Sequence, residues 1–260
     1  MRIAICIKQV PLTSEGRMDE NRGTLLRDGL SKIMNPYDAA ALEAALRIKN
    51  QSGGTADVFT MGPESAEQVL TDAFSVGVDS GYLVSDGCFS GADVFATSYT
   101  LAQALTAVGG YDIIVCGAKT TDGSTGQTGA SIAAQLNMPY VGRVDEIEGQ
   151  DEKSIRVWQS IGQTRSLVSV SFPCVLSVER DNFVLRMPTL KQRLSASQKK
   201  AQRIRLSDLR DNDARSYGQS GSFTRVERIV SVQRKALHPI VYTNAATAAD
   251  MILSAVEVKQ

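Results

Sequence analysis

Histidine is almost absent from this chain, which has a single one, His238, among 260 residues. Nucleophilic catalysis of the Ser/His or Cys/His kind depends on an imidazole placed beside the nucleophile. The sequence therefore disfavours the classical hydrolases, and we assign no catalytic acid, base or nucleophile.

Clustered cysteines are also missing. The four cysteines lie far apart, with neither a C-x-x-C pair nor a histidine nearby, so the usual zinc and iron–sulfur spacings are excluded and we expect no metal site. Isolated thiols of this kind are typical of a reducing compartment, and we expect a cytoplasmic location. The cysteines are Cys6, Cys88, Cys116 and Cys174.

The chain has neither a long apolar run nor an excess of charge of one sign. No segment approaches the roughly 18 to 20 apolar residues that span a bilayer, and residues 1–10 show no cleavage pattern of a signal peptide. Lys and Arg number 28, as do Asp and Glu, a balance unusual for a general polyanion binder. We therefore expect neither membrane insertion nor a nucleic-acid partner.

The first 140 residues alternate short apolar runs with longer segments of helical period. Continuous apolar runs indicate strands that are covered on both faces, and the segments between them indicate crossover helices. The predicted strands cover residues 3–7, 56–61, 81–84, 111–116 and 174–178, with a hairpin-like pattern at 155–172. This is the pattern of an α/β domain with a parallel sheet, which we expect to end near Val178.

The composition changes after this predicted domain, which we place at residues 1–180. From Arg180 to Arg205 there are eight basic residues and one acid, Asp181, so residues 181–205 are expected to form a distinct, exposed basic arm. Such an arm is either a solvated face or a docking surface. Residues 206–260 are polar, with a final helix around 245–256, and we expect this extension to pack on the domain or on a partner.

The strongest local signal is the loop of residues 117–129, which has four glycines and four threonines in thirteen residues and leads into a helix. Glycines allow positive φ and a close approach of backbone N–H groups, and the helix N-terminus favours an anion. The loop is neither a Walker A motif nor a G-x-G-x-x-G motif. It is interpreted as a phosphate-binding loop, with plain flexibility as the alternative.

Other predicted site residues meet this loop at the carboxyl edge of the sheet, where open α/β proteins bind ligands. Asn35, Pro36 and Asp38 open a helix there, as N-cap, first helical residue and acid of the first turn. Cys6 and Met61 end two of the predicted strands. Each has a purely structural alternative, as a packing or helix-end residue, but their convergence favours a nucleotide site.

Five motifs in this order resemble the β subunit of electron-transferring flavoproteins, most clearly over residues 1–205. They are ICIKQVP at 5–11, MNPYD at 34–38, MGP at 61–63, GVD at 77–79 and DGSTGQTG at 122–129. The resemblance implies a Rossmann-like nucleotide-binding sandwich of the adenine-nucleotide α-hydrolase and stress-protein type, with a C-terminal arm and tail. It also implies a heterodimer with an FAD-carrying α subunit.

The resemblance implies either FAD or AMP in the pocket of this subunit. AMP-binding members tend to have three successive aspartates in the phosphate loop, whereas this loop has DGST at 122–125, similar to members that bifurcate electrons from NADH. The sequence GADVFATS at 91–98 also resembles the bifurcating group. FAD is therefore favoured. The family commonly has a Gln-Ala pair where this chain has AKTT at 118–121.

The function implied is oxidation of NADH, with one electron passing to the α-subunit FAD and on to an acyl-CoA dehydrogenase or similar flavoenzyme. The other passes to a low-potential acceptor, ferredoxin or flavodoxin. Partner recognition is implied for residues 184–190, in which Leu185 is the expected apolar anchor, together with Arg186, Met187 and Leu190. A non-bifurcating AMP-type subunit and a stress-type nucleotide sensor remain as alternatives.

The residues predicted to bind the cofactor are Cys6, Asn35, Pro36, Tyr37, Asp38, Met61, Gly62, Asp93, Thr97, Gly117, Asp122, Gly123, Ser124, Thr125, Gly126, Gln127 and Thr128.

Overall fold

A computed structural model describes residues 1–12, 18–19, 24–25, 31–227 and 244–257. The chain divides into two units, Met1–Glu227 and Arg228–Gln260. In the second unit the described residues form helix α6 (Ala245–Glu257), as the sequence predicted. His238 lies outside the described residues.

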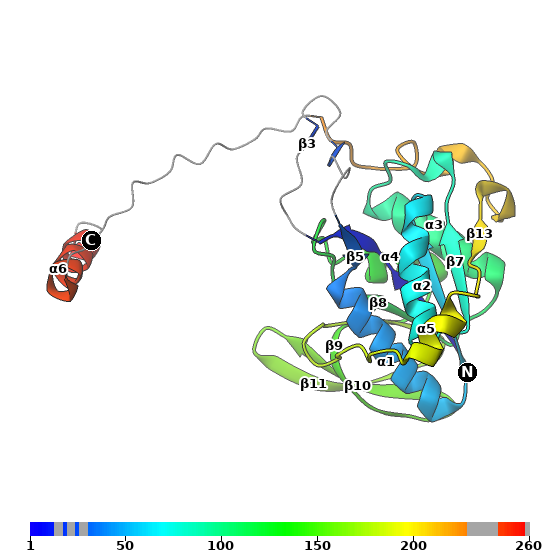
Figure 1. The fold of residues 1–260 in the computed structure, drawn as a ribbon, viewed down its shortest axis with the longest axis horizontal. Helices are drawn as coiled ribbons and strands as arrows, with labels where there is room; N and C mark the ends of the chain where they lie inside the picture. The colour runs from blue at the N-terminus through cyan, green and yellow to red at the C-terminus, as the bar shows by residue number, and fades with distance from the viewer. Residues whose placement is uncertain (13–17, 20–23, 26–30, 228–243, 258–260) are drawn as a thin grey trace. The chain divides into compact units, whose positions relative to one another are not determined.

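A nine-stranded, mostly parallel sheet forms the centre of the first unit (Figure 1). Its strands, in spatial order, are β11 (Thr164–Ser171), β10 (Ser154–Ile161), β9 (Tyr140–Gln150), β12 (Cys174–Val178), β8 (Ile113–Gly117), β1 (Arg2–Ile7), β6 (Thr55–Met61), β7 (Ser80–Val84) and β13 (Gln202–Ile204). Two pairings in this sheet are antiparallel, those of β10 with β9 and with β11. The predicted α/β class and all predicted strands are confirmed.

Helices cover both faces of the sheet. Ile3 and Ile5 of β1 belong to the core under α1 (Pro36–Ser52) and α2 (Glu67–Ser75). Ala4 and Cys6 belong to the core on the opposite face, under α3 (Val94–Val108) and α4 (Thr128–Leu136). Because successive side chains of a strand point to opposite faces, a strand covered twice is apolar throughout, which explains the continuous runs in the sequence.

Two small antiparallel pairs complete the N-terminal part. Strand β2 (Gln9–Pro11) pairs with β5 (Lys32–Met34), and β3 (Met18–Asp19) pairs with β4 (Thr24–Leu25). The first pair brings the end of β1 close to the start of α1, because the Asn35 amide donates to the carbonyl of Lys8 at 2.9 Å.

The sheet does not end at Val178, contrary to the expectation from the sequence. Strand β9 was not predicted, because two residues, Gly142 and Arg143, separate its buried Val141 and Val144 and break the alternation, and because its pairing contains register shifts. Strand β13 lies within the expected basic arm and extends the far edge of the sheet beside β7.

The basic segment 181–205 is therefore not a free arm. Phe183 and Ala196 are buried in the core on the α1–α2 face, and α5 (Leu190–Ala196) packs against α2 (Figure 1). The apolar residues are few and lie among basic ones, some of which bond to the domain, as Arg186 does to Glu43, so a count of charges alone missed the packing.

Residues 206–227 continue within the same unit. They contain two 3₁₀ turns, η3 (Leu206–Asp208) and η4 (Ala214–Ser216), and the fully buried Tyr217, whose ring lies 5.3 Å from that of Phe89. Of the described helices, none has the length and apolar character needed to cross a bilayer.

Candidate functional site

A cavity of about 1100 Å³ lies at the carboxyl ends of β1, β6, β7 and β8. Its lining comes from the residues that follow these strands, from the N-terminal part of α3, from the glycine-rich loop 117–128, and from Thr224 and Val226. The volume slightly exceeds the usual range for small-molecule sites, about 300–1,000 Å³. The predicted edge of the sheet thus carries a cavity large enough for a cofactor.

Most of the predicted cofactor residues contribute to this lining. Those that do are Cys6, Asp38, Met61, Gly62, Asp93, Thr97, Gly117, Gly123, Thr125, Gly126 and Thr128. The remaining ones, which do not line it, are Asn35, Pro36, Tyr37, Asp122, Ser124 and Gln127. Several of this second group shape the loop or the helix start instead.

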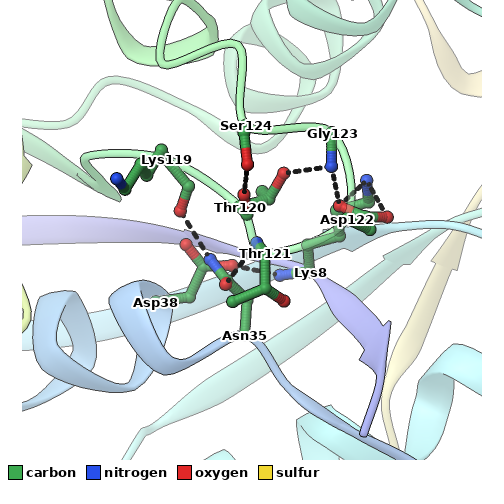
Figure 2. A network of polar contacts seen from close by, with 9 residues as sticks. All are labelled: Lys8, Asn35, Asp38, Lys119, Thr120, Thr121, Asp122, Gly123 and Ser124. Atoms are coloured by element: carbon green, nitrogen blue, oxygen red, sulfur yellow. Dashed lines mark hydrogen bonds and ion pairs between the residues drawn. The ribbon is translucent and has the colours of Figure 1, made fainter. Parts of the chain in front are cut away.

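Asn35 holds the glycine-rich loop from below. Its side chain is fully buried, its Nδ2 donates to the carbonyl of Lys119 at 2.9 Å, and its Oδ1 accepts from the amide of Thr121 at 3.3 Å (Figure 2). The expected side-chain cap of α1 is absent, because these bonds use the amide for the loop. The next residue, Pro36, takes the first helical position as predicted.

Asp122 also acts within the loop. Lys8 Nζ donates to both of its carboxylate oxygens, at 2.9 and 2.7 Å, and the amide of Gly123 donates to Oδ1 at 2.8 Å (Figure 2). Burial alone would raise the pKa of Asp122, but the hydrogen bond and charge of Lys8 outweigh it and lower the pKa. Lys8 therefore ties the end of β1 to the loop.

The loop geometry exposes donors to the cavity. Ser124 and Gly126 have φ of 52° and 64°, and the amides of the first turn of α4 have no side-chain cap. Alternation of backbone conformation in this way orients N–H groups toward one side, and the helix start adds its positive end. With the hydroxyls of Thr125 and Thr128, the loop presents a donor-rich surface suited to phosphate oxygens.

Asp38 forms part of the cavity floor. It is buried, and its Oδ2 accepts from the amide of Lys8 at 2.7 Å. Burial raises the pKa of this carboxyl to about 7, against the opposing effect of hydrogen bonds from Asn35, Lys8 and Gly117. A Cβ on Gly117 would lie 2.3 Å from Asp38 Oδ1, so only glycine fits between the carboxylate and the cavity.

Two thiols complete the floor. Cys6 and Cys116 are register partners in β1 and β8, and both line the cavity. A hydrogen bond with Cys6, and then burial, raise the pKa of the Cys116 thiol, so Cys116 remains protonated at neutral pH. Both cysteines are largely buried, which supports the packing role that the sequence left open.

Asp93 lines the cavity, but its carboxylate bonds to its own chain. Oδ1 accepts from the amide of Ala96 at 2.9 Å and so caps α3, and Oδ2 accepts from the amide and hydroxyl of Thr224, both at 2.9 Å. Phe223 packs on Phe95 with ring centroids 4.4 Å apart. Asp93 therefore anchors residues 222–226, which we call the strap, beside the cavity.

Sequence reasoning missed the wall formed by residues 84–91 and by the strap. The first of these could have been predicted, because residues 85–87 directly follow the third predicted strand, 81–84, and open α/β proteins bind ligands where strands end. The strap had no local signal, since it is brought to the cavity by contacts with a residue some 130 positions earlier.

The predicted partner-binding residues separate into two groups. Val184, Met187 and Leu190 are 79%, 81% and 74% exposed. Leu185 is half-buried against the core, and the guanidinium of Arg186 bonds to Glu43 of α1. The role of these residues in recognition stays a prediction.

The parallel sheet, the donor-rich loop at its carboxyl edge and the cavity behind that loop define an α/β protein of the nucleotide-binding class. The electron transfer flavoprotein domain matches residues 22–209 of the chain. An electron transfer flavoprotein subunit beta from Thermoanaerobacterium thermosaccharolyticum is 38% identical over 226 residues, 87% of this chain and 86% of that protein. The chain belongs to the electron transfer flavoprotein family.

Two further relatives extend the comparison. The beta subunit from Clostridium acetobutylicum is 34% identical over 256 residues, 98% of this chain and 97% of that protein. Subunit CarD of a caffeyl-CoA reductase-Etf complex from Acetobacterium woodii is 42% identical over 182 residues, 70% of this chain and 69% of that protein. The expected family and a role in electron transfer are thereby confirmed.

Proposed function

We propose that the chain is the β subunit of a heterodimeric, cytoplasmic electron-transferring flavoprotein and that its cavity binds FAD. When bound, a flavin supplies hydride acceptance and one-electron transfer. The assembly would oxidise NADH and divide the two electrons between the FAD of the α subunit and a ferredoxin or flavodoxin. The α-subunit electron would continue to an acyl-CoA dehydrogenase or a similar flavoenzyme.

The loop fits a pyrophosphate group. The donors are the uncapped backbone amides at the start of α4 and the hydroxyls of Thr125 and Thr128, and the positive φ angles of Ser124 and Gly126 shape the loop that carries them. Lys8 neutralises the carboxylate of Asp122. A loop with three free carboxylates would repel a dianionic ligand, whereas this loop presents N–H and hydroxyl groups.

The observation that carries the proposal is the extent of the cavity. It reaches from the phosphate loop to Phe89, Asp93, Thr97 and Leu101, so it continues past the space that a mononucleotide on the loop requires. The far part is lined by apolar side chains and by the start of α3, which suits a flat aromatic ring system. This favours FAD over AMP.

The protein's task in such a reaction is to hold and orient the cofactor, and no acid–base side chain is required of it. Backbone amides and the fixed contacts of Asn35 and Asp38 provide this rigidity. The relationship to CarD, whose name places it in a reductase–Etf complex, agrees with a role in a larger redox assembly.

The docking surface that we propose for the dehydrogenase consists of the exposed Val184, Met187, Leu190 and Leu194. Exposed basic residues flank them: Lys191, Arg193, Lys199 and Lys200. Apolar side chains at the centre of an interface supply most of the affinity, and surrounding charge steers the encounter. The partner should therefore present an apolar pocket with an acidic rim.

The proposal is tested by co-producing the chain with its α subunit and quantifying the nucleotides that denaturation releases. Two FAD per heterodimer and no AMP are expected. One FAD and one AMP would instead make the chain a subunit of a single-flavin carrier. A stable monomer that binds a nucleotide without any α subunit would favour the alternative function, a nucleotide sensor of the stress-protein type.

A further inference from the structure

Glu43 is a buried carboxylate in the middle of α1, far along the helix from the cavity residues of its first turn. Its side chain is 7% exposed, and it accepts hydrogen bonds from two arginines. Arg47, one turn later, donates from Nε to Oε1 at 3.1 Å. Arg186 donates from Nε to Oε2 at 2.9 Å and from its terminal nitrogen to Oε1 at 3.1 Å.

Arg186 is held by its backbone as well. Its amide donates to Glu43 Oε2 at 3.2 Å, so one carboxylate fixes both the main chain and the side chain of this residue. Burial alone would raise the pKa of Glu43, but the hydrogen bonds from Arg186 and Arg47 outweigh it and lower this pKa. The hydrogen bond to Glu43 in turn raises the pKa of Arg186. The pair is ionised at every physiological pH.

The contact lies in the middle of a loop that is fixed at both ends. Phe183 is buried in the core with the guanidinium of Arg47 over its ring, and Thr189 forms a capping box that starts α5. Between these ends the exposed Val184 and Met187 stand on either side of Arg186. Together with Leu185, which packs against the core, the bonds from Arg186 to Glu43 therefore determine how these two apolar side chains are presented.

Stability alone does not explain an ion pair at this position. Glu43 is removed from water while Arg186 keeps part of its exposure, and burying a charge opposes the attraction of its partner, so that an apolar pair of similar volume is often as stable. The pair of hydrogen bonds between the guanidinium of Arg186 and the carboxylate of Glu43 restricts these side chains to one relative orientation. A rigid loop binds a partner more tightly than a mobile one because less conformational entropy is lost on docking.

We propose that Glu43 is a positioning residue for partner recognition: through Arg186 it preorganises residues 184–188 so that Val184 and Met187 project together toward the partner flavoenzyme. This inference rests on the docking surface proposed above, but the rigidity of the loop can be measured without any partner. A result that contradicts the positioning role of Glu43 can therefore be distinguished from one that contradicts the docking surface.

The first test uses the heterodimer with Glu43→Gln. Trypsin requires a free arginine side chain, so the bond between residues 186 and 187 should resist cleavage in the wild type and be cut about tenfold faster or more in the variant. Hydrogen exchange of the Arg186 amide should accelerate by a similar factor. Unchanged cleavage and exchange would overturn the proposal.

Two variants serve as controls. Asp145→Asn removes another carboxylate that an arginine, Arg165, contacts through two nitrogens; Asp145 lies in β9 and bonds to none of residues 184–188, so cleavage at 186–187 should be unchanged. Arg186→Lys keeps the charge and the trypsin site but not the pair of hydrogen bonds, and should loosen the loop as Glu43→Gln does. It also takes the place of Glu43→Gln if that variant fails to assemble.

The second test measures electron delivery from the reduced heterodimer to a purified acyl-CoA dehydrogenase. In Arg186→Lys, which leaves the net charge unaltered, KM for the dehydrogenase should rise about three- to tenfold while kcat is unchanged. A loosened loop with an unchanged KM would refute the link between Glu43 and recognition, and would count against the docking surface as well.

Discussion

Asp38 and Gly117 meet at the floor of the cavity with no spare space between them. The carboxylate receives backbone amides from the end of β1 and from the start of the glycine-rich loop, and so joins two strand ends that are far apart in the sequence. At the level of single residues, the shape of the site depends on the contact between Asp38 and Gly117 and on the side-chain amide of Asn35.

Gly117→Ala tests the tightness of the floor. The added Cβ would lie 2.3 Å from Asp38 Oδ1 and 2.8 Å from the carbonyl carbon of Tyr37, and backbone cannot yield as a flexible side chain does. We expect a loss of about 1–3 kcal/mol in unfolding free energy and a lower nucleotide content. Gly110→Ala is the control, since nothing lies within 4 Å of its added Cβ, and its thermal midpoint should match the wild type.

Asp38 also predicts a pH dependence. The folded pKa of about 7 exceeds the unfolded value of 3.8, so between these pH values the unfolded chain loses a proton that the folded chain keeps. The stability contributed by this site therefore falls as pH rises toward 7 and is constant above it. Relative to Asp38→Asn, the wild type should lose about 3 kcal/mol between pH 5 and pH 8 in urea unfolding. Parallel pH profiles of the two proteins would contradict this assignment.

The N-terminus of α3 shows how one residue links two elements. Asp93 caps this helix with one oxygen and holds the strap with the other. Its amide in turn donates to the hydroxyl of Ser222 at 2.9 Å. The position of this side wall of the cavity therefore depends on the hydrogen bonds of Asp93.

Two substitutions at Asp93 separate the cap from the strap. Asp93→Ser retains an oxygen for the cap but has none for Thr224, and we expect faster nucleotide release with little loss of stability. Asp93→Ala loses both contacts and should cost about 1 kcal/mol in addition. Release rates and hydrogen exchange of residues 222–226 measure the effect. Equal release from the wild type and Asp93→Ser would show that the strap does not retain the ligand.

Elements with regular periodicity were predicted within a few residues of their observed bounds. Strand β1 and helix α1 follow directly from an unbroken apolar run and from the Asn-Pro start. Strand β9 was missed because a bulge interrupts its alternation, and β13 because its three residues pair only when the segment 181–205 has crossed α2. Such pairings depend on packing, which no local pattern records.

Across the whole molecule, the two proposed functions lie at separate places. The cavity opens at the carboxyl edge of the sheet, and the docking residues lie on α5 and the loop before it. The family resemblance implied Leu185 as the apolar anchor of this loop, and that role stays a prediction. Its side chain is half-buried against the core, whereas those of Val184, Met187 and Leu190 are exposed.

Leu190→Ala and Leu185→Ala should therefore differ. Leu190 is 74% exposed, so its truncation should leave the thermal midpoint unchanged and raise KM for the dehydrogenase about tenfold. Leu185→Ala should lower the stability of the subunit by about 1–2 kcal/mol, because it removes packing from a half-buried site. Steady-state kinetics and melting curves distinguish them, and a KM unaffected by Leu190→Ala would remove this residue from the interface.

The sequence by itself determined the α/β class, the position of the sheet edge and the glycine-rich loop that leads into α4, because periodicity and glycine spacing act within short stretches of chain. Only the tertiary structure decided how far the cavity extends, that the carboxylate of Asp93 holds the strap, and that Arg186 bonds to Glu43. These contacts join residues more than a hundred positions apart. They arise when complete elements pack, and the free energy of that packing is not encoded in any single segment.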